Sequence, residues 1–144
     1  MMKKRYLLVV ACIGLVVGLV GFLAPHQALT AKECRMIMLQ GGTARYQDAI
    51  YIDPETTFVD KDACLVWINN IRTAEIKIKF ADGKKCADVT QAPVGFKLDE
   101  ANCFVTTWVP YGGTSSLNFM ESGVYDYTVE INKGVTKQGR VIVK

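Results

Sequence analysis

The chain has 144 residues, the length of a single domain, and half of its residues are hydrophobic. Its formal net charge of +3 comes from Lys3, Lys4 and Arg5, because the rest of the chain holds equal numbers of basic and acidic residues. Nucleic-acid binding needs an excess of positive charge, so this composition argues against a nucleic-acid partner.

The basic N-terminus is followed by an apolar run from Tyr6 to Ala24 that contains no charged residue. This order is typical of an export signal. The run is longer than the core of a typical signal peptide and close to the length that spans a bilayer, so cleavage and retention both stay open. We expect residues 1–31 to be a signal peptide or an N-terminal membrane anchor. The rest of the chain is then exported to the periplasm or another extracytoplasmic space.

Four of the five cysteines lie in the exported part: Cys34, Cys64, Cys86 and Cys103. An even number of cysteines in an oxidising compartment predicts two disulfides, for which three pairings exist. We favour Cys34 with Cys64, which would tie the N-terminal end to a core strand, and Cys86 with Cys103, which would close an insertion. The spacing fits neither a zinc site nor haem attachment.

From residue 49 onward the chain consists of short alternating segments separated by turn residues, which is typical of strands. Strands are expected at residues 49–52, 56–59, 63–69, 75–80, 103–109, 114–119, 123–131 and 139–143. This pattern predicts an all-β fold, an antiparallel Greek-key β-sandwich over residues 49–144. Residues 32–48 are expected to form an N-terminal extension or an edge strand. Residues 81–103 are the least regular part, with a helical turn near "KLDEAN".

Four segments in this order, "IDPETTFVDKDACLVWIN", "PYGGTSSLNF", "SGVYDYTV" and "GRVIV", resemble the cupredoxins, the plastocyanin-like copper proteins. The resemblance implies a two-sheet sandwich of cupredoxin type. The segment "ESGVYDY" is also similar to a corner motif of immunoglobulin domains, with Tyr127 in place of the cysteine, so an immunoglobulin-like sandwich is the alternative. Against it, Cys64 lies only three residues before Trp67, which is too close for the spacing in that family.

The ligands of a type 1 copper site are missing at the positions that the resemblance implies. Such a site needs two histidines, one cysteine and a weak axial methionine. The loop of residues 70–75 lacks the first histidine, Val129 stands where the cysteine would be, and the only histidine of the chain is His26. We therefore expect a degenerate copper site without a cofactor. The missing imidazole also removes the usual base of a serine or cysteine nucleophile, so no enzymatic activity is expected.

A sulfur-rich segment, "CRMIM", offers an alternative metal site. If it is extended, Cys34, Met36 and Met38 share one face, and Met120 is a candidate fourth ligand. A thiolate with thioethers suits Cu(I), which defines an alternative function as a copper carrier or sensor. In the competing interpretation, Met36 and Met38 fill the edge of the core while Ile37 faces outward.

Two aromatic residues are candidates for an exposed contact surface. Trp67 lies inside an apolar strand and is expected in the core, whereas Trp108 and Tyr111 lie near a strand end. Together these observations predict a non-enzymatic accessory or protein-interaction domain of the bacterial envelope, with membrane contact only if the N-terminal segment is uncleaved. An electron-transfer partner protein is a further alternative.

Overall fold

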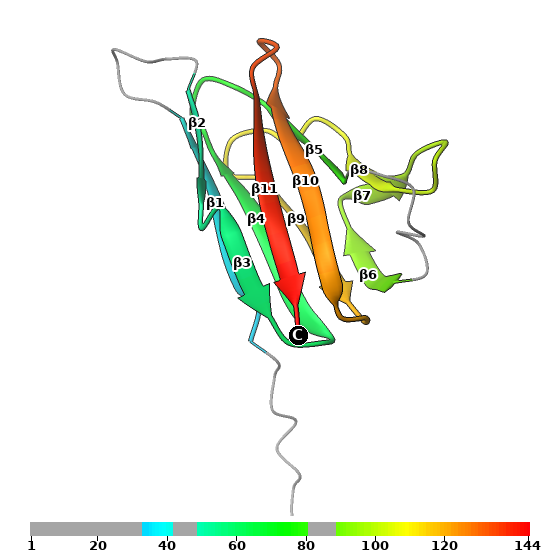
Figure 1. Ribbon diagram of the computed structural model, residues 1–144. Coiled ribbons are helices and arrows are strands. Elements are labelled where there is room, and N and C mark those ends of the chain that lie inside the picture. Colours follow the sequence, from blue (N-terminus) through cyan, green and yellow to red (C-terminus); the bar gives the residue numbers. More distant parts are fainter. Residues whose placement is uncertain (1–32, 42–48, 81–88) are drawn as a thin grey trace, which may run out of the picture. The chain divides into compact units, whose positions relative to one another are not determined.

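The computed structural model describes residues 33–41, 49–80 and 89–144, which form two β-sheets packed face to face (Figure 1). The expected export segment, residues 1–31, lies outside the described residues. Within the described part of the chain, no helix has the length and apolar character needed to cross a membrane.

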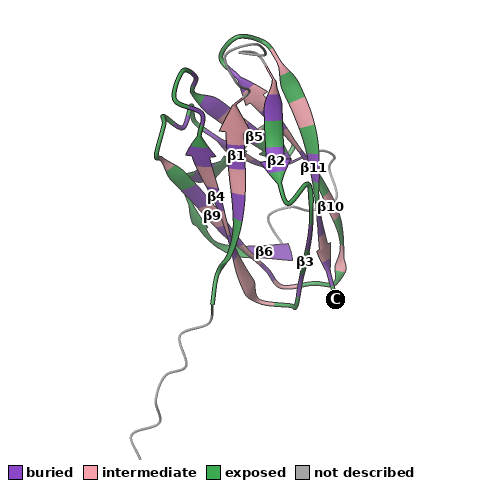
Figure 2. Ribbon diagram, turned by 90° about the vertical axis from the view of Figure 1, so that its left-hand side faces the viewer, coloured by how far each residue is buried: buried purple, intermediate pink, exposed green. Residues whose placement is uncertain are grey.

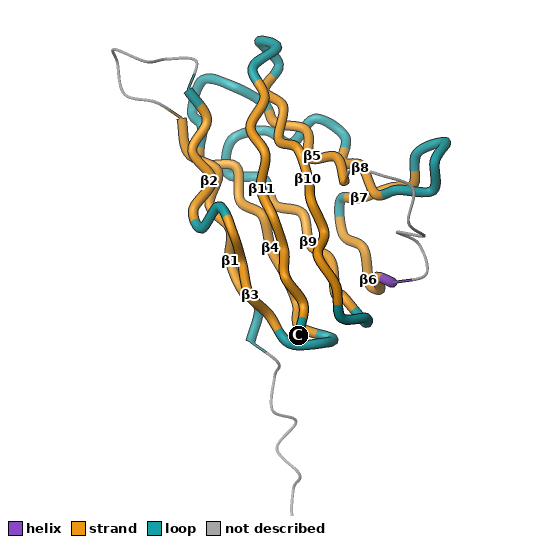
Figure 3. The backbone as a smooth tube through the Cα atoms, in the orientation of Figure 1, coloured by secondary structure: helices purple, strands orange, loops and turns teal. Residues whose placement is uncertain are grey.

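The strands in chain order are β1 (Arg35–Gly41), β2 (Ile50–Asp53), β3 (Thr56–Val59), β4 (Ala63–Asn70), β5 (Ile76–Phe80), β6 (Thr90–Val94), β7 (Phe96–Leu98), β8 (Phe104–Thr106), β9 (Thr114–Phe119), β10 (Gly123–Ile131) and β11 (Thr136–Val143). One sheet has five strands in the order β2-β1-β4-β9-β6, and the other has six in the order β3-β11-β10-β5-β8-β7. The tube in Figure 3 shows how loops at both ends of the sandwich carry the chain between these sheets.

The predicted all-β sandwich is confirmed, but its sheets are mixed rather than purely antiparallel. β1 runs parallel to β4, and β3 runs parallel to β11. For β1 and β4, the parallel direction follows from the connection between them. The chain leaves the five-stranded sheet after β2, forms β3 in the other sheet and returns as β4. Two strands separated by such a crossover are free to run in the same direction.

The core forms because alternate residues of the central strands are apolar and buried, which Figure 2 shows as alternating bands along the strands. Trp67 lies at its centre and is 1 % exposed. Its indole ring makes edge-to-face contacts with Phe80, Phe96 and Tyr127, with ring centroids 5.5 to 5.7 Å apart. This is the geometry that aromatic pairs prefer. The prediction that Trp67 belongs to the core is confirmed.

A glycine makes room for one ring of this core. Gly139 in β11 lies directly opposite Tyr127 in β10. A Cβ atom at position 139 would lie 2.7 Å from Cε2 of Tyr127, closer than real Cβ atoms approach other atoms. The tyrosine ring therefore packs over the bare backbone of β11, which fixes its position between the sheets.

Residues 35–41 correct two expectations of the sequence analysis. They form neither an edge strand nor an extension outside the sandwich, because β1 lies between β2 and β4. Ile37 and Leu39 are fully buried, whereas Met36 and Met38 lie on the outer face of the sheet. The assignment of the two methionines to the core edge, with Ile37 outside, is therefore wrong. Residues 42–48 lie outside the described residues.

The irregular segment 81–103 contains two strands that the sequence analysis missed, β6 and β7; residues 81–88 are not among those described. In place of a helical turn at "KLDEAN", Asp99 forms a side-chain-capped turn. Its Oδ1 accepts hydrogen bonds from the backbone N–H groups of Ala101 (3.0 Å) and Cys103 (2.9 Å). The Cys103 bond is the main reason that the pKa of Asp99 lies below its usual value.

Candidate functional site

Three connections meet at one end of the sandwich, which we call the loop end: residues 71–75 between β4 and β5, residues 107–113 between β8 and β9, and residues 132–135 between β10 and β11. Backbone hydrogen bonds join them. Asn132 N donates to Glu75 O at 3.1 Å, and Ile76 and Val109 exchange two bonds at 2.7 and 3.0 Å. These bonds make the loop end part of the folded unit.

The side chain of Asn69 holds the loop end together from inside. Its Nδ2 donates to the carbonyl oxygens of Ala74 at 3.0 Å and Val109 at 2.9 Å, and its Oδ1 accepts from the N–H of Ile71 at 2.9 Å. Asn69 is fully buried, so each of these bonds replaces a lost contact with water. This role was not predicted from the sequence, although an asparagine among the buried positions of an apolar strand is a signal for it.

The residues at the loop end do not fit a type 1 copper site. Val129, where the resemblance places the cysteine, is 0 % exposed and packs in the core. In the loop where the first histidine would stand, Ile71 is 3 % exposed, and Gly41 leaves room for its side chain. A hydrocarbon side chain occupies the cysteine position, and residues 32–144 contain no histidine. Within the described ranges, no group of three or more His, Cys, Asp or Glu residues is placed to hold a metal ion.

The loop end instead exposes the two aromatic residues singled out from the sequence. Trp108 is 37 % exposed and Tyr111 is 49 % exposed. The ammonium of Lys77 lies 4.5 Å from the centroid of the Trp108 ring, and the guanidinium of Arg72 lies 5.9 Å from that of Tyr111. Each ring therefore has a cation on one face. We call these four residues the aromatic surface; its role in binding stays a prediction.

The predicted sulfur ligands are not assembled as a Cu(I) site. Cys34 forms a disulfide with Cys64, which confirms one predicted pairing and leaves Cys34 without a thiolate. Met36 is 61 % exposed, and Met38 is half-buried beside it on the outer face. Met120 follows β9, which is two strands away from β1 in the sheet.

The second predicted disulfide concerns Cys86 and Cys103. Cys103 is a buried free cysteine in the structure. Cys86 lies outside the described residues, so the pairing of these two cysteines stays a prediction.

Comparison with known proteins supports the fold. No protein-family model and no curated protein matches the chain. Among solved structures, the purple cupredoxin from Nitrosopumilus maritimus is 18% identical, with a TM-score of 0.50 over 76% of this chain and 98% of its own. A reduced variant of amicyanin is 16% identical, with a TM-score of 0.49 over 81% of this chain and 88% of its own. The two observed sheets and the match to the purple cupredoxin show a cupredoxin-like β-sandwich fold, as the resemblance implied.

The motif that resembled immunoglobulin domains has a local structural basis. Tyr125 donates a hydrogen bond from its hydroxyl to the carbonyl oxygen of Glu121 at 3.0 Å. A tyrosine that bonds back to the backbone a few residues upstream is a corner found in such sandwiches. The segment "ESGVYDY" therefore encodes a sandwich corner, and this corner occurs here in a cupredoxin-like fold.

Proposed function

We propose that this chain is an exported, copper-free cupredoxin-like domain that binds a protein partner in the bacterial envelope and has no enzymatic activity. One observation carries the proposal: the end of the fold where the resemblance implies copper ligands holds buried hydrocarbon side chains and exposes Trp108 and Tyr111. The Cys34–Cys64 disulfide supports export, because disulfides persist in oxidising compartments.

The aromatic surface has the properties of a contact site. Tryptophan, tyrosine and arginine are the residues most enriched among those that dominate binding energy. The loop that carries Trp108 and Tyr111 is bonded to the core through Asn69, so little conformational entropy would be lost on binding. Arg72 and Lys77 beside the rings would favour a partner that presents carboxylates to this surface.

Site-specific photo-crosslinking in the intact envelope tests the proposal. A photoreactive side chain replaces Trp108 in the full chain, and the control carries it at Tyr51, which is 55 % exposed on β2. We expect a discrete adduct from position 108 that is lost when Tyr111→Ala is added, and no such adduct from position 51. The same products from both positions, or no adduct from position 108, would contradict the proposal.

The Cu(I)-carrier alternative has one observation in its favour, which is that Met36 and Met38 lie on the accessible outer face. The disulfide at Cys34 opposes it. Titration of the oxidised protein with Cu(I), compared with a Met36→Ala, Met38→Ala double variant, distinguishes the two functions. Stoichiometric binding that the double variant loses would establish the carrier, whereas equally weak uptake by both proteins supports the copper-free domain.

A further inference from the structure

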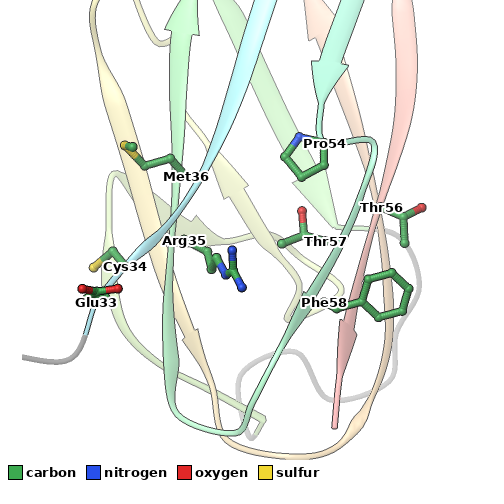
Figure 4. Close-up of a pocket in the computed structure, with 8 residues that line it drawn as sticks. All are labelled: Glu33, Cys34, Arg35, Met36, Pro54, Thr56, Thr57 and Phe58. Atoms are coloured by element: carbon green, nitrogen blue, oxygen red, sulfur yellow. The ribbon is translucent and has the colours of Figure 1, made fainter.

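The side of the sandwich between β1 and β3 is open. β3 is the outer strand of the six-stranded sheet, and in the described part of the chain β11 is its only partner strand. In the other sheet, β2 covers β1 only along residues 38–41. A groove of about 660 Å³ lies between these edges, lined by residues 33–36, Pro54 and residues 56–58 (Figure 4).

The outward edge of β3 presents backbone groups that β11 does not use. The carbonyl oxygens of Glu55 and Val59 accept bonds from Arg140 and Lys144 of the β11 segment, at 2.9 and 3.0 Å. Because successive residues of a strand direct these groups to opposite sides, the N–H and C=O of Thr56 and Phe58 point to the open edge. An edge of this kind accepts an additional strand.

We propose that the added strand is β3 of a second copy of this chain, paired antiparallel about a two-fold axis. Only Thr56 and Phe58 of β3 direct their backbone groups outward. In a symmetric antiparallel ladder, hydrogen-bonding residues lie opposite each other, so each even-numbered residue must face an even-numbered residue of the second copy. Two such registers place three of the four residues of β3 opposite β3 of the second copy. The first places Phe58 opposite the partner's Phe58, and the second places Thr57 opposite the partner's Thr57.

Side-chain chemistry selects the first register. Phe58 is 54 % exposed, and facing its own copy it forms an aromatic cross-strand pair. In the second register Phe58 faces the partner's Thr56 and Glu55 faces the partner's Val59. The aromatic pair therefore favours pairing centred on Phe58.

Cysteine crosslinking tests the register in the unit Lys32–Lys144, which is compact and contains its own hydrophobic core. Opposed residues in a hydrogen-bonded antiparallel pair have Cα atoms about 5.5 Å apart, a separation that a disulfide spans. Phe58→Cys should therefore form a disulfide-linked dimer at least about tenfold faster than Val124→Cys, because pairing raises the local thiol concentration. Val124 is similarly exposed, at 59 %, but lies in β10, away from the edge.

Sedimentation equilibrium provides the second measurement, with no added cysteine. The unmodified unit should dimerise as its concentration rises, Phe58→Lys should stay monomeric, and Tyr51→Lys should behave like the unmodified unit. Circular dichroism checks that Phe58→Lys is folded, as expected for an exposed site. A monomer at every concentration, or equal crosslinking rates at positions 58 and 124, would overturn the proposal.

Discussion

Asn69 and Val109 are 40 residues apart in the sequence, yet Asn69 Nδ2 donates a hydrogen bond to the carbonyl oxygen of Val109 at 2.9 Å. This buried bond attaches the loop of Trp108 and Tyr111 to the central strand of the five-stranded sheet. The exposed rings are therefore held in place by the core of the domain. Such preorganisation is what a rigid binding surface requires.

The first prediction concerns this bond. Asn69→Leu keeps the volume of the side chain but leaves the N–H of Ile71 and the carbonyl oxygens of Ala74 and Val109 without their partner. Since buried polar groups are costly to leave unpaired, we expect unfolding free energy to fall by about 3 kcal/mol in urea titrations. Asn118→Leu, at a half-buried position on the outer face of β9, is the control and should cost less than about 1 kcal/mol. Equal effects of the two changes would contradict the assigned role.

The two tryptophans should differ sharply in their importance for folding. Trp67→Ala removes the centre of the aromatic core and should lower unfolding free energy by about 4 kcal/mol. Trp108→Ala removes a partly exposed ring and should cost less than about 1 kcal/mol. Urea titration measures both. A large loss of stability with Trp108→Ala would show that its ring supports the fold rather than a contact surface.

The disulfide should contribute through the chain entropy of the unfolded state. Cys34 and Cys64 are separated by 30 residues, and closing a loop of this length is worth about 3 to 4 kcal/mol in the chain-entropy model. We expect the Cys34→Ser, Cys64→Ser variant to lose about this amount in urea titrations under oxidising conditions.

The same variant also reports on Cys86 and Cys103. If they form the second predicted disulfide, adding a reductant lowers the stability of the variant further. If Cys103 is free, as in the structure, the reductant has no further effect. A variant as stable as the unmodified protein would contradict a stabilising role of the Cys34–Cys64 bond.

Stability should fall at alkaline pH because of Tyr127. Burial raises the pKa of its hydroxyl from 10.0 to about 12. Between these values the unfolded chain loses the proton while the folded chain keeps it, so rising pH favours unfolding. The stabilisation is complete below pH 10 and is lost as the pH approaches 12, at roughly 1.4 kcal/mol per pH unit.

Tyr127→Phe isolates this effect. In the described part of the chain the hydroxyl forms no hydrogen bond of full geometry, and the nearby Trp67 side chain only opposes the effect of burial on its pKa. The variant should therefore match the unmodified protein within about 1 kcal/mol near neutral pH. Above pH 10 the variant should become progressively more stable than the unmodified protein in urea titrations. Parallel pH profiles for the two proteins would show that Tyr127 does not titrate between folded and unfolded states as described.

Strands with one apolar face were predictable from the sequence, and others were not. β3, β9 and β10 have the predicted bounds. Alternating polar and apolar residues, or turn residues at the strand ends, made these bounds visible in the sequence. In β1 both alternating sets contain apolar residues, Met36 and Met38 in one and Ile37 and Leu39 in the other. Periodicity could not decide which set is buried, and packing against the second sheet decides for the isoleucine and leucine.

The irregular strands and the internal contacts of the site depend on tertiary structure. β6 contains Pro93, and Ala92 has a positive φ of 50°, so its pairing with β9 is irregular and lacks a clear alternating pattern. The exposure of Trp108 and Tyr111 followed from their place near a strand end. The bond from Asn69 to Val109 did not, because it joins segments that only the folded chain brings together.

The proposed function requires that the loop end binds no copper. Its most direct test is to add Cu(II) to the oxidised unit of residues 32–144 and to record the visible spectrum and the urea midpoint. We predict no intense copper–thiolate band and no shift of the midpoint, because a ligand that does not bind the folded state cannot stabilise it. A coloured, one-electron-active protein with a raised midpoint would contradict the claim.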